Sequence, residues 1–135
     1  MVGKQAPEER RFIDHVSIGV TDLRRSVRFY DAVLCDALGA ERVELSGYGY
    51  GYGRGNPSLW LKHDELPPAS GHVCFRVADR EAVARFHAAG LAAGGKDDGA
   101  PGPRPEYGPH YFAAYLLDPD GTRVEAAVGR PAGEP

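Results

Sequence analysis

A short segment near the start of the chain is repeated in its second half, and this repeat constrains the fold more than any other feature. Residues 15–22 read His-Val-Ser-Ile-Gly-Val-Thr-Asp, and residues 72–79 read His-Val-Cys-Phe-Arg-Val-Ala-Asp. The same register aligns the Arg-Phe pair at 28–29 with the pair at 85–86, giving six identities over sixteen positions, where ordinary residue frequencies would give about one. A duplicated unit predicts two similar modules about an approximate twofold axis, which can bring the two histidines together.

The size and composition of the chain exclude several classes of protein. At 135 residues it is long enough to bury its own core as one domain, and its apolar fraction of 42% is ordinary for a globular protein. A net charge of -3 offers no basic surface for nucleic acid or an anionic membrane, and no apolar run reaches the roughly eighteen residues of a membrane span. The two cysteines, Cys35 and Cys74, are too few for a disulfide framework, which favours a reducing compartment and hence the cytoplasm.

The first half of the chain has the pattern of a strand, a helix and three further strands. Residues 12–20 alternate between apolar and other side chains, which predicts a strand with His15 and Ser17 on the face away from the main apolar layer. Asp22 is a helix N-cap, and the helix is expected to end near Gly39. The expected strands that follow cover residues 41–46, 48–54 and 57–63.

The second half repeats this order less clearly. Val73, Phe75 and Val77 form the buried face of the expected strand, and Asp79 caps a helix that stops at Gly94-Gly95. The expected elements after it are a short strand near residue 96, a loop over 99–109, and a hairpin of 111–118 and 122–128. We therefore expect one domain over 12–128, with modules of about 12–66 and 70–128 and with flexible tails at 1–11 and 129–135.

Glycine and tyrosine alternate strictly over residues 47–53. This period of two predicts a strand that places Tyr48, Tyr50 and Tyr52 on one face. Together with Trp60 these side chains would suit a flat aromatic ligand, although aromatic residues on a curved sheet are as commonly part of the core.

The turn Asp118-Pro119-Asp120-Gly121 fixes the register of the final hairpin. Proline suits the first central position of a type I turn, and Gly121 can take the left-handed conformation that follows it, so Asp118 is expected to lie opposite Thr122. Tyr115 would then lie opposite Glu125, on the face that does not carry the apolar side chains. A carboxylate on the concave side of a sheet needs a partner.

Two histidines and this glutamate would form a metal site. Two imidazoles and one carboxylate leave coordination positions open, which is typical of catalytic rather than structural sites and favours a divalent transition metal such as Fe, Mn, Ni, Co or Zn. We therefore predict His15, His72 and Glu125 as the metal ligands. Of the residues expected on the same face, Arg76 can bind an anionic group of a substrate and Tyr115 can donate a proton or hydrogen bond.

Three stretches of the sequence resemble the vicinal oxygen chelate superfamily, which includes glyoxalase I, extradiol dioxygenases, fosfomycin-resistance proteins and bleomycin-resistance proteins. They are DHVSIGVTDLRRSVRFY, GHVCFRVADREAVARFH and YFAAYLLDPDGTRVEA. The resemblance spans roughly residues 12–128. It implies an α+β fold of two βαβββ modules whose curved sheets form an open, barrel-like cavity, usually in a homodimer. It also implies the same three metal ligands and a small-molecule substrate that chelates the metal through adjacent oxygens.

One departure from the family pattern bears on the reaction. Glyoxalase I typically has a fourth ligand at the position symmetric to Glu125, and aligning residues 59–61 with 124–126 puts Trp60 there. Tryptophan is neither a ligand nor a base, which disfavours authentic glyoxalase I activity and leaves lyase, dioxygenase or transferase chemistry of the same type. The residues expected to line the pocket are Ser17, Tyr48, Tyr50, Tyr52, Trp60, Cys74 and His110. The alternative is a metal-free, bleomycin-resistance-like protein that only binds its ligand.

Overall fold

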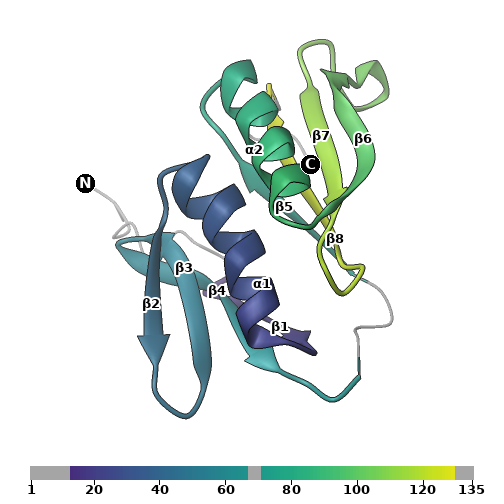
Figure 1. The fold of residues 1–135 in the computed structure, drawn as a ribbon. Helices are drawn as coiled ribbons and strands as arrows, with labels where there is room; N and C mark the ends of the chain where they lie inside the picture. The colour runs from purple at the N-terminus through teal and green to yellow at the C-terminus, as the bar shows by residue number, and fades with distance from the viewer. Residues whose placement is uncertain (1–12, 67–70, 130–135) are drawn as a thin grey trace, which may run out of the picture.

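The computed structural model describes residues 13–66 and 71–129, which form two four-stranded mixed sheets and their helices (Figure 1). The first sheet has the strand order β1 (Val16–Val20), β4 (Asn56–His63), β3 (Gly49–Arg54) and β2 (Glu41–Leu45). The second has the order β5 (His72–Arg76), β8 (Arg123–Val128), β7 (Phe112–Leu117) and β6 (Lys96–Pro103). This confirms the α+β fold of two βαβββ units, and the sheets do not close into a barrel.

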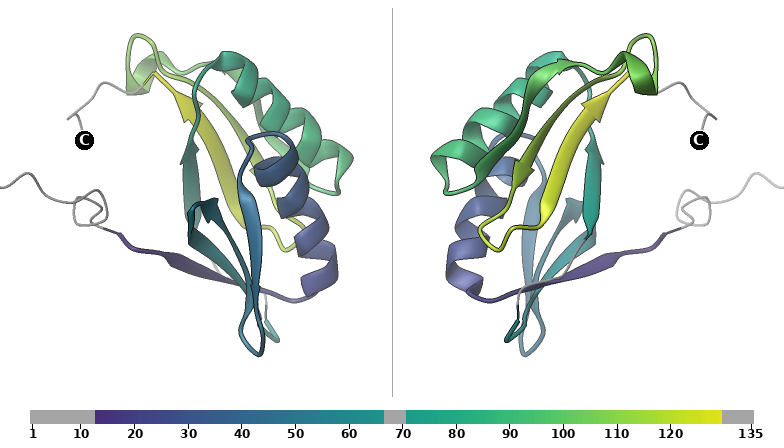
Figure 2. Two further views of the ribbon diagram at one scale, coloured as in Figure 1. Left: turned by 90° about the vertical axis from the view of Figure 1, so that its left-hand side faces the viewer. Right: turned by 90° about the vertical axis from the view of Figure 1, so that its right-hand side faces the viewer.

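Both expected helices form, and each begins at the aspartate that the sequence indicates. The N-cap of α1 (Leu23–Tyr30) is Asp22, which accepts a hydrogen bond from the amide of Arg25, and the N-cap of α2 (Arg80–Ala92) is Asp79, which accepts one from the amide of Ala82. The π-helix η2 (Asp31–Asp36) continues α1 towards Gly39. Both helices cover the same side of the sheets, which leaves the opposite faces open (Figure 2).

The strand registers show that the two units are built alike. Strand β1 pairs in parallel with β4, and β5 pairs in parallel with β8. Ser17 lies opposite Trp60, and Cys74, its counterpart in the repeat, lies opposite Glu125. Trp60 is therefore the structural counterpart of Glu125, as the sequence alignment predicts.

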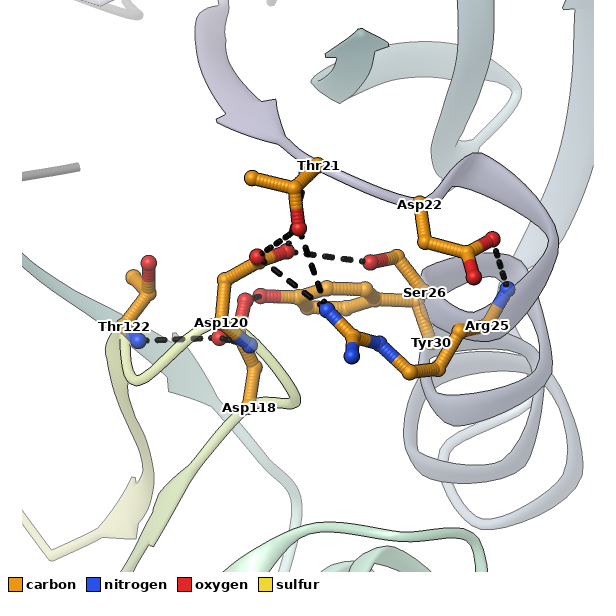
Figure 3. A network of polar contacts seen from close by, with 8 residues as sticks. All are labelled: Thr21, Asp22, Arg25, Ser26, Tyr30, Asp118, Asp120 and Thr122. Atoms are coloured by element: carbon orange, nitrogen blue, oxygen red, sulfur yellow. Dashed lines mark hydrogen bonds and ion pairs between the residues drawn. The ribbon is translucent and has the colours of Figure 1, made fainter. Parts of the chain in front are cut away.

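The turn between β7 and β8 belongs to the second unit and contacts the first (Figure 3). We call its residues, Asp118–Thr122, the docking turn. Its conformation is the expected one, because the amide of Asp118 donates to the carbonyl of Thr122 and Gly121 has a φ of 91°. One carboxylate oxygen of Asp118 accepts hydrogen bonds from the amides of Asp120 and Thr122. The other accepts one from the Tyr30 hydroxyl at 2.7 Å, so the turn is fixed internally and held against α1.

Asp120 carries the second half of this contact. Its side chain is only 3% exposed and accepts hydrogen bonds from the amide and hydroxyl of Thr21, just before the N-cap of α1. The guanidinium of Arg25 lies 3.2 Å from the same carboxylate. A buried carboxylate with this many donors is stable only in one orientation, so the docking turn sets how the second sheet sits relative to α1.

The strand β6 is longer than the sequence predicts. We expected a short strand near residue 96 and a loop from Gly99, but β6 runs from Lys96 to Pro103 and only the following residues form a loop with a short 3-10 helix, η3 (Pro105–Tyr107). Its pairing with β7 shifts register on both sides of Gly99. These irregularities accommodate the prolines and glycines that a regular strand would exclude.

The prediction that the three tyrosines share one strand face is wrong. Tyr50 and Tyr52 lie in β3 and pack against the core on the helix side, with the Tyr52 hydroxyl donating to Asp31 at 2.9 Å. Tyr48 precedes β3, in a turn, and its ring lies against Trp60 on the opposite face. The alternation therefore holds within β3 but ends one residue too early to include Tyr48.

The expected tails at 1–11 and 129–135 lie outside the described residues, apart from Gly129. Within the described part of the chain, no helix is long and apolar enough to cross a membrane.

The docking turn predicts a specific loss of stability. Replacing Asp120 with alanine removes the acceptor for Thr21 and the counterion of Arg25, and we expect the free energy of unfolding to fall by about 2–3 kcal/mol. Asp98→Ala is the matched control, because Asp98 is paired with Arg123 at the surface and its loss should cost less than about 1 kcal/mol. Urea denaturation followed by circular dichroism measures both, and equal losses would show that the docking turn is not a special contact.

Candidate functional site

His72 and Glu125 meet on the open face of the second sheet. His72 is the first residue of β5, and Glu125 lies on the adjacent strand β8. The His72 Nε2 atom is 2.8 Å from Glu125 Oε1. The glutamate side chain is only 3% exposed, whereas the histidine side chain is 45% exposed, so the pair opens to solvent through the imidazole.

Two tyrosines of the neighbouring chain segment surround this carboxylate. The hydroxyl of Tyr111 donates to Glu125 Oε2 at 2.8 Å, so both carboxylate oxygens have a partner. Tyr115 lies opposite Glu125 in the β7–β8 register, as predicted, and the centre of its ring is 6.2 Å from that of His72. Sequence reasoning missed Tyr111, although its spacing of four from Tyr115 was the signal that both share a strand face.

Both tyrosines are hydrogen-bond donors at neutral pH. Burial and the hydrogen bond to Glu125 raise the pKa of Tyr111 well above its ordinary value. Burial and the negative charge of Glu125 raise the pKa of Tyr115 to about 12. Neither phenol can therefore serve as a general base near pH 7, and each can supply a proton or a hydrogen bond.

The pocket at this pair has a volume of about 300 Å³. Its lining residues are His72, Cys74, Tyr107, Tyr111, Tyr115, Arg123 and Glu125. The guanidinium of Arg123 lies 4.3 Å from the centre of the Tyr115 ring and is paired with Asp98. Arg104, from the chain just after β6, lies 5.4 Å from the same ring and donates hydrogen bonds to backbone carbonyls.

The structure does not bring His15 to this pair. His15 lies just before β1, its side chain is 49% exposed, and its Nδ1 atom is 2.7 Å from a carboxylate oxygen of Asp14. Among the described residues, no three side chains of histidine, cysteine, aspartate or glutamate converge as a metal site. Within one chain, two of the three predicted ligands, His72 and Glu125, are therefore in contact, and His15 is not part of this cluster.

The donors that do converge fit a divalent transition metal. An imidazole nitrogen and a carboxylate oxygen are ligands that such ions accept. The hydrogen bond from Tyr111 to the second oxygen of Glu125 fixes the orientation of the carboxylate, as partners of ligating carboxylates commonly do. His72 and Glu125 thus have the chemistry of two of the three ligands of a facial metal site.

The open face of the first sheet is aromatic at the corresponding place. Trp60 stands where Glu125 stands in the second sheet, and its ring centre lies 5.5 Å from that of Tyr48 in an edge-on contact. The hydroxyls of Tyr48 and Ser17 are 2.8 Å apart. Gly51 lies opposite Trp60, and an added Cβ there would come within 2.9 Å of the indole. The indole therefore packs directly against the backbone of β3.

The remaining predicted pocket residues lie at different distances from the pair. Cys74 lines the pocket, while Arg76, two residues further along the same face of β5, lines two neighbouring cavities instead. His110 is exposed and is not among the residues that line the His72 pocket. Tyr50 and Tyr52 are on the helix side of the first sheet, where Tyr52 is 1% exposed.

Comparison with known proteins gives a consistent result. The family model described as "Glyoxalase/Bleomycin resistance protein/Dioxygenase superfamily" matches residues 12–126. A glyoxalase/bleomycin resistance protein from Albidiferax ferrireducens T118 is 32% identical, with a TM-score of 0.76 over 87% of this chain and 98% of that one. No curated protein shows significant sequence similarity to the chain.

Two more distant structures share the fold. A glyoxalase/bleomycin resistance protein/dioxygenase family enzyme from Burkholderia phytofirmans PsJN is 22% identical, with a TM-score of 0.68 over 85% of this chain and 96% of that one. The fosfomycin resistance protein FosX from Mesorhizobium loti is 21% identical, with a TM-score of 0.64 over 85% of this chain and 89% of that one.

The buried glutamate predicts different effects for two tyrosines of the pocket. Tyr111→Phe removes the hydroxyl that donates to Glu125 Oε2, and we expect it to lower the free energy of unfolding by about 1–3 kcal/mol because the buried acceptor loses this donor. Tyr107→Phe is the control, since this side chain is 61% exposed, and it should change stability by less than about 0.5 kcal/mol. Thermal and urea unfolding compare the two. A Tyr111→Phe protein as stable as the parent would mean that the hydrogen bond does not hold the carboxylate.

Proposed function

The chain belongs to the glyoxalase/bleomycin resistance protein/dioxygenase superfamily, and on this premise we propose that it is a metal-dependent enzyme acting on a small substrate. Members of this superfamily commonly bind divalent metals. The observation that carries the proposal is the contact between the exposed imidazole of His72 and the buried carboxylate of Glu125. The substrate would bind through adjacent oxygens beside these residues, and the reaction would be a lyase, dioxygenase or transferase reaction rather than that of glyoxalase I.

We propose that His72, Glu125 and His15 hold the metal, which is Fe, Mn, Ni, Co or Zn. When bound, such an ion supplies Lewis-acid chemistry and orients the reactants. The Tyr111 hydroxyl holds the carboxylate of Glu125 in place. Tyr115 keeps its proton because of its raised pKa, and its hydroxyl is the candidate donor to a substrate oxygen in the pocket.

The position of His15 favours a site shared between two copies of the chain. His15 is half-exposed at the start of an edge strand, and no third ligand from the described part of its own chain joins His72 and Glu125. A twofold dimer in which the open face of one copy meets that of the other would bring His15 of one copy to the pair of its partner. We therefore propose a cytoplasmic homodimer with two such sites.

Metal content tests the ligand set. We expect protein purified without chelator to hold about one divalent metal ion per chain, and His72→Ala, Glu125→Ala and His15→Ala each to lower the metal affinity at least tenfold, because a lost ligand cannot be replaced by its neighbours. His110→Ala is the matched control and should retain the metal. Elemental analysis after dialysis measures the content. Unchanged metal in the His72→Ala protein would contradict the proposal.

Mixing two variants tests the shared site. His15→Ala and Glu125→Ala are each expected to lose both sites, but a mixed dimer would contain one complete site from the intact His15 of one chain and the intact Glu125 of the other. Unfolding and refolding the variants together should therefore restore metal to about a quarter of all sites, since half of the dimers are mixed and each has one site. No recovery, with dimers confirmed by light scattering, would show that each site is built within one chain.

The aromatic face of the first sheet favours a second candidate function, a metal-free binding protein. Trp60 and Tyr48 form a half-buried aromatic surface on the open side of the sheet. The chain has a single tryptophan, so its fluorescence reports on this surface alone. Two results would together favour this function: a flat aromatic compound quenches the Trp60 fluorescence in excess EDTA, and the Trp60→Leu protein binds the same compound more weakly in calorimetry. Binding that requires metal would instead favour the enzyme.

A further inference from the structure

A separate cavity of about 380 Å³ lies at the seam between the two sheets. Strand β5 forms its wall on one side through Cys74, Phe75 and Arg76, and the ends of β3 and β4 form the other. Strand β5 pairs only with β8, and β4 pairs only with β1 and β3, so no ladder of backbone hydrogen bonds closes the seam. Side chains alone determine what this space can hold.

The charged groups of the seam cavity are both positive. They are Arg54 at the end of β3 and Arg76 at the end of β5, and no carboxylate is among the lining residues. The side chain of Arg76 makes no hydrogen bond or ion pair with any residue in the described ranges, and the side chain of Arg54 donates only to the backbone carbonyl of Leu38. Two guanidinium groups that line one cavity, with no counterion among the described residues, are suited to a planar anion such as a carboxylate.

Much of the remaining lining of the cavity is apolar. It includes Leu34, Leu59 and Phe75, which belong to the hydrophobic core or pack against it. The volume falls within the range of small-molecule sites, about 300–1,000 Å³. Two cationic side chains and an apolar lining in one cavity match a ligand with a charged head and an apolar body.

We propose that the seam cavity binds an organic anion, with its carboxylate between Arg54 and Arg76 and its apolar body against Leu34, Leu59 and Phe75. The site draws one arginine from each module, so a bound ligand bridges the two modules and stabilises the folded chain by an amount that grows with the logarithm of its concentration above the Kd. Neither His72 nor Glu125 lines this cavity. Binding therefore requires no metal and stands apart from the function proposed above.

Calorimetric titration with octanoate at low ionic strength tests the site. We expect one octanoate per chain, with binding weakened about tenfold in Arg54→Gln and in Arg76→Gln, because each variant loses one charge-assisted contact. Octanol has the same apolar body without the charge, and acetate has the charge without the body, so both should bind at least tenfold more weakly. Ser58→Phe, which fills the cavity from β4, should abolish binding.

Two controls separate this site from the His72 pocket. Arg104→Gln removes a guanidinium that lies 5.4 Å from the centre of the Tyr115 ring of that pocket, and His72→Ala in EDTA removes any bound metal. Both proteins should bind octanoate as the parent does. Circular dichroism and thermal unfolding confirm that each variant folds. Equal affinity for octanol, unchanged affinity in Arg76→Gln, or loss of binding in Arg104→Gln or in His72→Ala would each overturn the proposal, whatever the metal content of the protein.

Discussion

The burial of two carboxylates in the docking turn is the constraint on which the arrangement of the molecule depends. Asp118 and Asp120 lie at the tip of the hairpin that carries Glu125, and their acceptors are filled by donors from the turn itself and from α1. Because a buried carboxylate without donors is strongly unfavourable, the hairpin can pack on the first module in only one position. That position determines the direction in which the open face of the second sheet points.

The sequence predicted those parts of the fold that local chemistry determines. The repeat, the two aspartate caps and the turn with Gly121 each act over a few residues, and they sufficed to place Tyr115 opposite Glu125 and to make Trp60 the counterpart of Glu125. The full length of β6 was missed because its pairing with β7 tolerates irregular register, which no periodic pattern reveals. Tyr48 was misplaced because a turn, rather than the strand, decides which side its ring takes.

The candidate site could be anticipated only in part, because its members depend on contacts of different range. His72 and Glu125 come from adjacent strands, and their meeting follows from the register. Tyr111 contributes through a hydrogen bond that depends on the depth of the carboxylate, which a sequence pattern does not record. His15 precedes the first strand of the other sheet, so its distance from this pair depends on how modules, and copies of the chain, are assembled.

The contact between Trp60 and Gly51 has a consequence for how this protein can evolve. In the second module, Glu125 lies opposite Tyr115 and accepts a hydrogen bond from Tyr111, which precedes Tyr115 by four residues. In the first module, Gly51 corresponds to Tyr115, because it lies opposite Trp60, and Gly47 corresponds to Tyr111. A single mutation from Trp60 to glutamate would therefore place a carboxylate opposite a glycine, with no tyrosine at the positions that correspond to Tyr111 and Tyr115. Rebuilding the arrangement that holds Glu125 would require changes at both glycine positions as well, so the difference between the two modules is hard to reverse one step at a time.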